Sequence, residues 1–102
     1  MDIKEIQDYC RKKKLRWTQH IFLRLTQRRI TMSDVENTIL NGDIIESYPD
    51  DYPSPSCLVL GFVKDNMPIH VVCGIHEDEL WLITAYHPNP EDWSEDYRKR
   101  KE

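Results

Sequence analysis

The periodicity of apolar residues changes once along this chain of 102 residues, and that change limits the fold more than any other feature. Before Gly42 the apolar residues recur every three or four positions, as they do on one face of a helix. From Asp43 onward they form four short runs separated by turn-forming residues, which is the pattern of strands. Helices grouped before strands favour an α+β domain.

The first half predicts three helices, over residues 2–14, over residues 17–29, and from Thr31 or Ser33 to Leu40. Thr18 has a side chain suited to the N-cap of the second helix. The third helix can begin with a capping box, and Asn41-Gly42 supplies its end. The apolar stripes of such short helices need a larger surface to cover them.

The second half predicts four strands, over residues 44–48, 57–63, 69–75 and 80–86. Most of their connections are short enough for hairpins, which favours an antiparallel order. The charged residues 91–102 predict a short C-terminal helix. We therefore expect N-terminal helices packed on one face of a four-stranded antiparallel sheet, with the second face free to hold a site.

Composition places the chain among single-domain globular proteins, with one domain over residues 1–102. At 39% hydrophobic and 31% charged residues it is too apolar for a disordered chain and too polar for a membrane protein. The longest apolar run, Cys57 to Val63, is far shorter than the roughly 18 residues of a membrane-spanning helix. The first residues lack the layout of a signal peptide, so we expect a cytoplasmic protein without membrane contact.

The three cysteines are widely spaced, which disfavours both a disulfide framework and a zinc knuckle. His70 and Cys73 would point to opposite faces of a strand, so they do not form a metal site with His76. We expect reduced thiols, no bound metal and no cofactor.

Charge is distributed unevenly along the chain. Residues 1–30 hold nine basic and three acidic residues, a balance of +6, so the other 72 residues carry −10. Such asymmetry is typical of a polyanion-binding region, although a charged run is more often a solvated helix face. If the basic region binds RNA, its contacts to the phosphate backbone are Lys12, Lys13, Lys14 and Arg16.

A second group of polar residues suits RNA strand scission without a metal. That reaction needs a base for the 2′-hydroxyl, an acid for the leaving 5′-oxygen and cations for the developing phosphorane charge. The candidates are His20, Arg24 and Arg28 on one helical stripe, His70 on a strand, and Tyr86 at the end of the last strand, with Glu46 as the one carboxylate base. The alternatives are that His20 and Arg24 form a surface ladder and that Tyr86 is a core aromatic.

Several stretches together resemble domain of unknown function family 4258, a group of small bacterial and archaeal proteins. They are Trp17 to His20, Arg24-Leu25, Arg28, Ile30, Asp34 to Glu36, Asn41 to Glu46, Tyr48-Pro49, Pro55 to Leu58, Pro68 to Val72 and Tyr86 to Pro90. The resemblance covers roughly residues 16–97 and leaves residues 1–15 as a basic N-terminal helix. Arg29 departs from the pattern, because the family commonly has Gly there.

The resemblance implies a RelE-like, barnase-like ribonuclease fold and a zinc-finger antitoxin of the YgiT type as partner. The family's recurrent polar positions fall on His20, Arg24, Arg28 and His70, with Tyr86 near the last strand's end. We therefore expect a toxin-like, metal-independent endoribonuclease of a type II toxin–antitoxin system. The rival is a non-catalytic module that binds protein or nucleic acid.

The structure can separate the enzyme from the binding module, and it can also show whether the chain forms a dimer. Convergence of His70, Arg24 and Arg28 on one cleft would favour the enzyme, and dispersal over two faces would favour the module. Trp81, Trp93 and Tyr97 either cover the sheet within one chain or pack across a homodimer.

Overall fold

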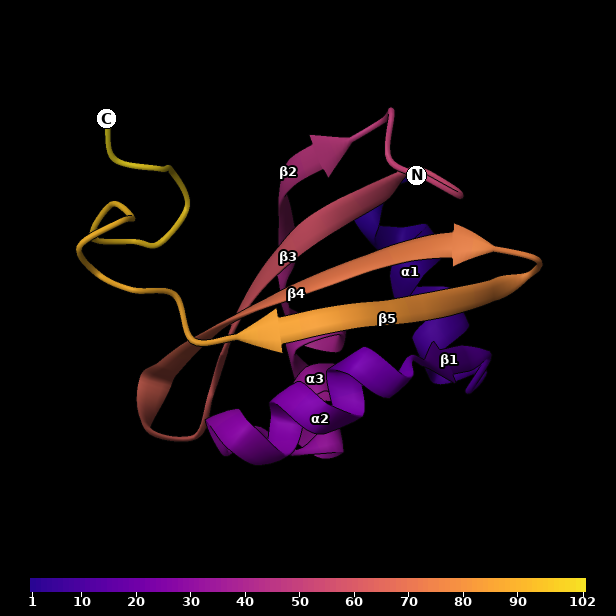
Figure 1. Cartoon of the computed structure of the whole chain (residues 1–102), viewed down its shortest axis with the longest axis horizontal. Helices are drawn as coiled ribbons and strands as arrows, with labels where there is room; N and C mark the ends of the chain where they lie inside the picture. The colour runs from indigo at the N-terminus through magenta and orange to yellow at the C-terminus, as the bar shows by residue number, and fades with distance from the viewer.

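The sheet has five strands in the spatial order β1-β5-β4-β3-β2, and the computed structural model describes all residues 1–102 (Figure 1). The strands are β1 (Leu15–Trp17), β2 (Asp43–Tyr48), β3 (Ser56–Val63), β4 (Met67–His76) and β5 (Glu79–Tyr86). Strands β2 to β5 form an antiparallel meander, and a short 3₁₀ turn, η1 (Lys64–Asn66), joins β3 to β4.

The expected four-stranded antiparallel sheet is wrong, because β1 adds a parallel strand at the edge beside β5. Leu15 pairs with Leu80, and Trp17 pairs with Leu82. The chain leaves the first helix through a left-handed residue, Lys13, with φ 57°, which turns it into this strand. Three residues are too few to show an alternating pattern, so the sequence did not indicate this strand.

The three helices are α1 (Ile3–Arg11), α2 (Gln19–Arg28) and α3 (Met32–Asn41). The predicted N-cap of α2 is correct, because the Thr18 hydroxyl accepts from the backbone N–H of Ile21. Thr31, not Ser33, caps α3, in a capping box with Asp34. None of these helices has the length and apolar character that crossing a membrane requires.

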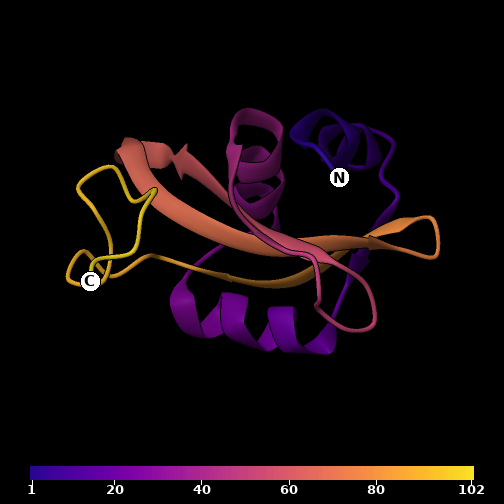
Figure 2. The ribbon, with the colours of Figure 1, turned by 90° about the horizontal axis from the view of Figure 1, so that it is seen from above.

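The hydrophobic core lies against the sheet face that α1 and α3 cover, and α2 closes it along the edge of β5. In Figure 2, α1 and α3 lie next to each other and α2 lies apart from them, beside β5. Alternate residues of the central strands, such as Val59, Val71 and Leu82, are fully buried on this helix face. Ile21 and Leu25 of α2 and Ile39 of α3 join the same core, so all three helices share it.

The expected C-terminal helix is also wrong. Residues 91–102 form turns and one isolated bridge between Trp93 and Arg100, and we call this segment the C-terminal strap. The hydroxyl of Ser94 bonds Asp96 and accepts from the backbone N–H of Lys99, local bonds that compete with helix formation. Trp93 is 4% exposed and packs on the second sheet face, which is therefore not free.

Candidate functional site

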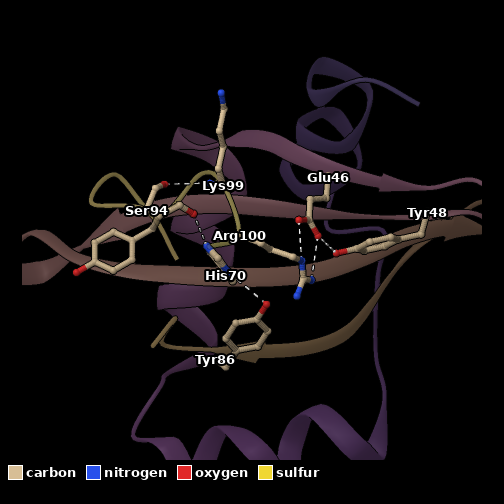
Figure 3. Close-up of polar contacts among 8 residues, drawn as sticks. Glu46, Tyr48, His70, Tyr86, Ser94, Lys99 and Arg100 are labelled. Carbon is tan, nitrogen blue, oxygen red and sulfur yellow. Dashed lines mark hydrogen bonds and ion pairs between the residues drawn. The ribbon is translucent and has the colours of Figure 1, made fainter. Parts of the chain in front are cut away.

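His70 is the centre of the polar cluster on the second sheet face (Figure 3). The side chain is fully buried, and both ring nitrogens have partners. Nε2 lies 2.9 Å from the carbonyl oxygen of Tyr97, which can only accept, so Nε2 carries the proton. Nδ1 therefore accepts from the Tyr86 hydroxyl, 3.2 Å away. Trp93 packs edge-on at a ring separation of 4.5 Å.

Burial keeps this pair uncharged. Loss of solvent lowers the pKa of His70 below its ordinary value of 6.5, against the opposing effects of the Tyr97 carbonyl and Glu46. Loss of solvent likewise raises the pKa of Tyr86 above 10.0. At neutral pH Tyr86 is thus a proton donor, and a neutral His70 orients its hydroxyl.

A second set of contacts links β2 to the strap. The Arg100 guanidinium donates to Glu46 at 2.9 and 3.1 Å, and the Tyr48 hydroxyl donates to the same carboxylate at 2.5 Å. Arg100 first, and then Tyr48, hold the pKa of Glu46 below its ordinary value. Burial and the bond to Glu46 raise the pKa of Tyr48 to about 12. The Arg100 guanidinium also stacks on Trp93, 4.8 Å from the ring centre.

Two surface hollows meet at His87. The Tyr86 hollow, of about 590 Å³, is lined by Tyr86, His87, Asn89 and the strap residues Glu91, Asp92, Trp93, Arg100, Lys101 and Glu102. The Arg28 hollow, of about 520 Å³, is lined by Arg28, Arg29, Thr31, Asp34, Val63, Lys64, Asp65, Met67 and His87. The Nδ1 of His87 donates to the Pro68 carbonyl at 3.1 Å, which leaves Nε2 free to accept a proton.

The structure brings together only part of the sequence-predicted catalytic set. Arg28 donates to the Ala85 carbonyl at 2.8 Å, which places its guanidinium beside Tyr86. Arg28 and Arg100 both act on the Tyr86 hydroxyl electrostatically. His20 and Arg24 line neither hollow, and Arg24 bonds Gln27 on its own helix. His70 bonds Tyr86 and Arg28 bonds the neighbouring residue, but His70 lines neither hollow and Arg28 lines only the Arg28 hollow. His70, Arg24 and Arg28 therefore do not meet in one cleft.

The four cations predicted to contact RNA all have carboxylate partners within the chain. Lys12 pairs with Asp8 at 3.0 Å, Lys13 with Glu36, Lys14 with Asp78 at 2.9 Å, and Arg16 with Glu79 at 2.8 Å. All four cationic side chains are exposed, so each ion pair contributes little to stability. RNA phosphate can therefore replace the carboxylate as the partner of the cation. Lys12, Lys13 and Lys14 lie in the turn between α1 and β1, Arg16 lies on β1, and none of the four lines either hollow.

Sequence reasoning missed three residues that the fold adds to this region: His87, Lys64 and Arg100. The adjacent Tyr86-His87 pair was a usable signal for His87. No local pattern marks Arg100 among four consecutive basic residues, because its partner Glu46 is 54 positions away. No group of three or more His, Cys, Asp or Glu side chains is arranged to hold a metal ion.

Comparison with known proteins gives one match. A family model described as "Domain of unknown function (DUF4258)" matches residues 17–87. The match includes β2 to β5, α2, α3 and both hollow-lining residues Arg28 and Tyr86, and it ends before the strap. No curated protein and no solved structure matched the chain.

Proposed function

Since the chain belongs to the DUF4258 family, whose description names no activity, we propose from its own site that it is a metal-independent endoribonuclease of the toxin kind. The proposal includes a RelE-like, barnase-like relationship and a zinc-finger antitoxin as partner. A small sheet with α1 and α3 on one face, α2 along the β5 edge and a polar cluster on the second face supports the relationship.

The observation that carries the proposal is the position of Tyr86. Its hydroxyl is bonded to a buried, neutral His70, and its ring lines a surface hollow. Arg28 bonds the carbonyl of the preceding residue, Ala85, and its charge acts on the Tyr86 hydroxyl, and His87 follows Tyr86 in the chain with a free Nε2. A proton donor, a proton acceptor and a cation are the groups that cleavage by 2′-hydroxyl attack needs.

In the proposed reaction, His87 Nε2 takes the proton of the ribose 2′-hydroxyl as that oxygen attacks phosphorus. His70 orients the Tyr86 hydroxyl before the reaction. Tyr86 then gives up this hydrogen bond and passes its proton to the leaving 5′-oxygen, and Arg28 stabilises the phenolate until the protonated His87 returns a proton to it. Arg28 stabilises the charge on the phosphorane oxygens. The products are a 2′,3′-cyclic phosphate and a free 5′-hydroxyl.

An end-labelled RNA assay in EDTA tests this reaction. We expect the parent protein to release cyclic phosphate ends, and Tyr86→Phe to lower the rate by about 100-fold, the lower end of general acid contributions. His20→Gln is the matched control, because His20 is exposed and outside both hollows. Equal rates for Tyr86→Phe and the parent would remove Tyr86 from the chemistry, and no cleavage by any form would refute the enzyme.

One observation favours the rival, a non-catalytic binding module. Glu91, Asp92 and Glu102 line the Tyr86 hollow, and carboxylates repel phosphate. A module would bind RNA or a partner protein without cutting RNA. RNA binding by gel shift, together with intact RNA after long incubation, would support this second function.

A further inference from the structure

We propose that the C-terminal strap, residues 91–102, is an autoinhibitory cover that keeps RNA away from Tyr86 and His70 and opens when its arginines exchange carboxylate partners for RNA phosphate. This inference rests on the proposed function and names the regulation of the same site. The family model matches residues 17–87, so the strap lies outside the matched domain and packs against it.

The strap makes the site unavailable in two ways. The Tyr97 carbonyl occupies the Nε2 hydrogen of His70, and Trp93 covers the ring, so His70 has no exposed surface. All the carboxylates that line the Tyr86 hollow also belong to the strap, namely Glu91, Asp92 and Glu102. The strap also supplies Arg100 and Lys101 to this lining, so opening the strap removes three negative and two positive charges from the hollow, a net change of +1.

Two of the contacts that hold the strap closed are ion pairs, which a polyanion can replace. Arg98 pairs with Asp43 at 2.5 Å, and Arg100 pairs with Glu46 at 2.9 Å, both on β2. The Arg98 and Arg100 side chains are 45% and 62% exposed, so phosphate can reach them. Exposed ion pairs are weak and screened by salt, whereas RNA offers many phosphates that can replace the carboxylate partners of Arg98 and Arg100.

The strap is built to move as a unit. Trp93 and Arg100 form a bridge, and the backbone N–H of Lys101 donates to the Asp92 carbonyl at 2.9 Å, so the segment closes on itself. Lys101 further bonds the Pro90 carbonyl through its side chain. The segment lies beyond the end of β5 (Figure 1), and Pro88-Asn89-Pro90 connects it there without strand pairing. Opening can therefore leave the sheet intact.

A charge exchange between Arg98 and Asp43 tests the inference in the full chain. Arg98→Glu and Asp43→Arg each place like charges together, whereas the double variant restores an opposite pair. Lys99→Glu is the matched control, because it makes the same charge change where the side chain has no hydrogen bond or ion pair in the structure (Figure 3). The readouts are hydrogen exchange of strap amides and the rate of RNA cleavage.

We expect each single variant to raise both strap exchange and cleavage by about two- to fivefold, as an exposed ion pair allows, and the double variant to return both to the parent values. Lys99→Glu should change neither. Faster exchange with unchanged cleavage would overturn the inhibition while the ribonuclease stands. Unchanged exchange in both single variants would overturn the role of the ion pair in holding the strap.

The full-length single variants also separate the two proposals. If Arg98→Glu and Asp43→Arg show faster strap exchange but no RNA cleavage, the proposed ribonuclease fails and the inhibition fails with it. A single-stranded DNA oligonucleotide, which lacks the 2′-hydroxyl and is not cut, tests the opening step in the parent. Faster strap exchange on its addition is expected, and unchanged exchange would overturn opening by phosphate.

Discussion

The buried His70 predicts a specific dependence of stability on pH. Because burial lowers its pKa in the folded protein, the unfolded chain takes up this proton first as the pH falls. Acid therefore favours unfolding, starting near the ordinary value of 6.5 and continuing down to the lowered folded value. His70→Gln removes this titration while an amide N–H can still donate to the Tyr97 carbonyl.

The size of the effect follows from one proton. When the unfolded chain binds one proton more than the folded chain, the free energy of unfolding falls by about 1.4 kcal/mol for each pH unit. At neutral pH we expect the parent to be more stable than His70→Gln, because the substitution disturbs packing against Trp93. This difference in the free energy of unfolding should shrink by about 1.4 kcal/mol for each pH unit as the pH falls below the ordinary histidine pKa.

Urea unfolding followed by tryptophan fluorescence, at about pH 7.5 and about pH 5.5, measures the gap directly. His20→Gln is the control, since His20 is exposed on α2. The comparison uses the difference in unfolding free energy between parent and His70→Gln, because the other titrating groups contribute equally to both proteins and cancel. A gap that stays constant over this range, or widens in acid, would refute the conclusion that His70 is neutral in the folded protein.

Three further outcomes are expected for stability, each measured by urea unfolding. Leu82→Ala leaves a cavity in the core where Leu82 is fully buried, and should lower the free energy of unfolding by about 3 kcal/mol. Gly61→Ala should cost about 1 to 3 kcal/mol, because the added Cβ would lie 2.8 Å from the Thr38 Cα and force α3 away from β3. Thr18→Ala should cost at least about 1 kcal/mol, since it removes the α2 N-cap and the hydroxyl proton that the Leu82 and Ile83 carbonyls of β5 share.

The antiparallel part of the fold could be read from the sequence because its signals are local. The predicted strands 44–48, 57–63, 69–75 and 80–86 each lie within β2 to β5 as observed. Thr18 likewise predicted the start of α2, because an N-cap hydrogen bond is local and here joins Thr18 to Ile21, three positions later. The parallel strand β1 was missed because its partner lies 65 positions later, at Leu80.

The strap and its effect on the site could not be predicted from local pattern. Its charge density suggested a helix, but Trp93 is held by His70 and Arg100 by Glu46, both distant in sequence. The expectation of an open site at His70 was wrong for the same reason, because the covering residues come from the far end of the chain. Tyr86 and Arg28 were predicted because their residue types suit the chemistry, and only the fold shows that Arg28 bonds the residue before Tyr86.

The pairing of β1 with β5 also sets an order of events during synthesis. Leu15 to Trp17 leave the ribosome early, but the edge of β5 that they pair with exists only after Leu82 has been made. Until then α1 and α2, on either side of β1, can form locally but cannot close over a finished sheet. The nascent chain must therefore keep its apolar helix faces soluble for most of its translation, and a chaperone or a rapid meander of β2 to β4 would protect it during this interval.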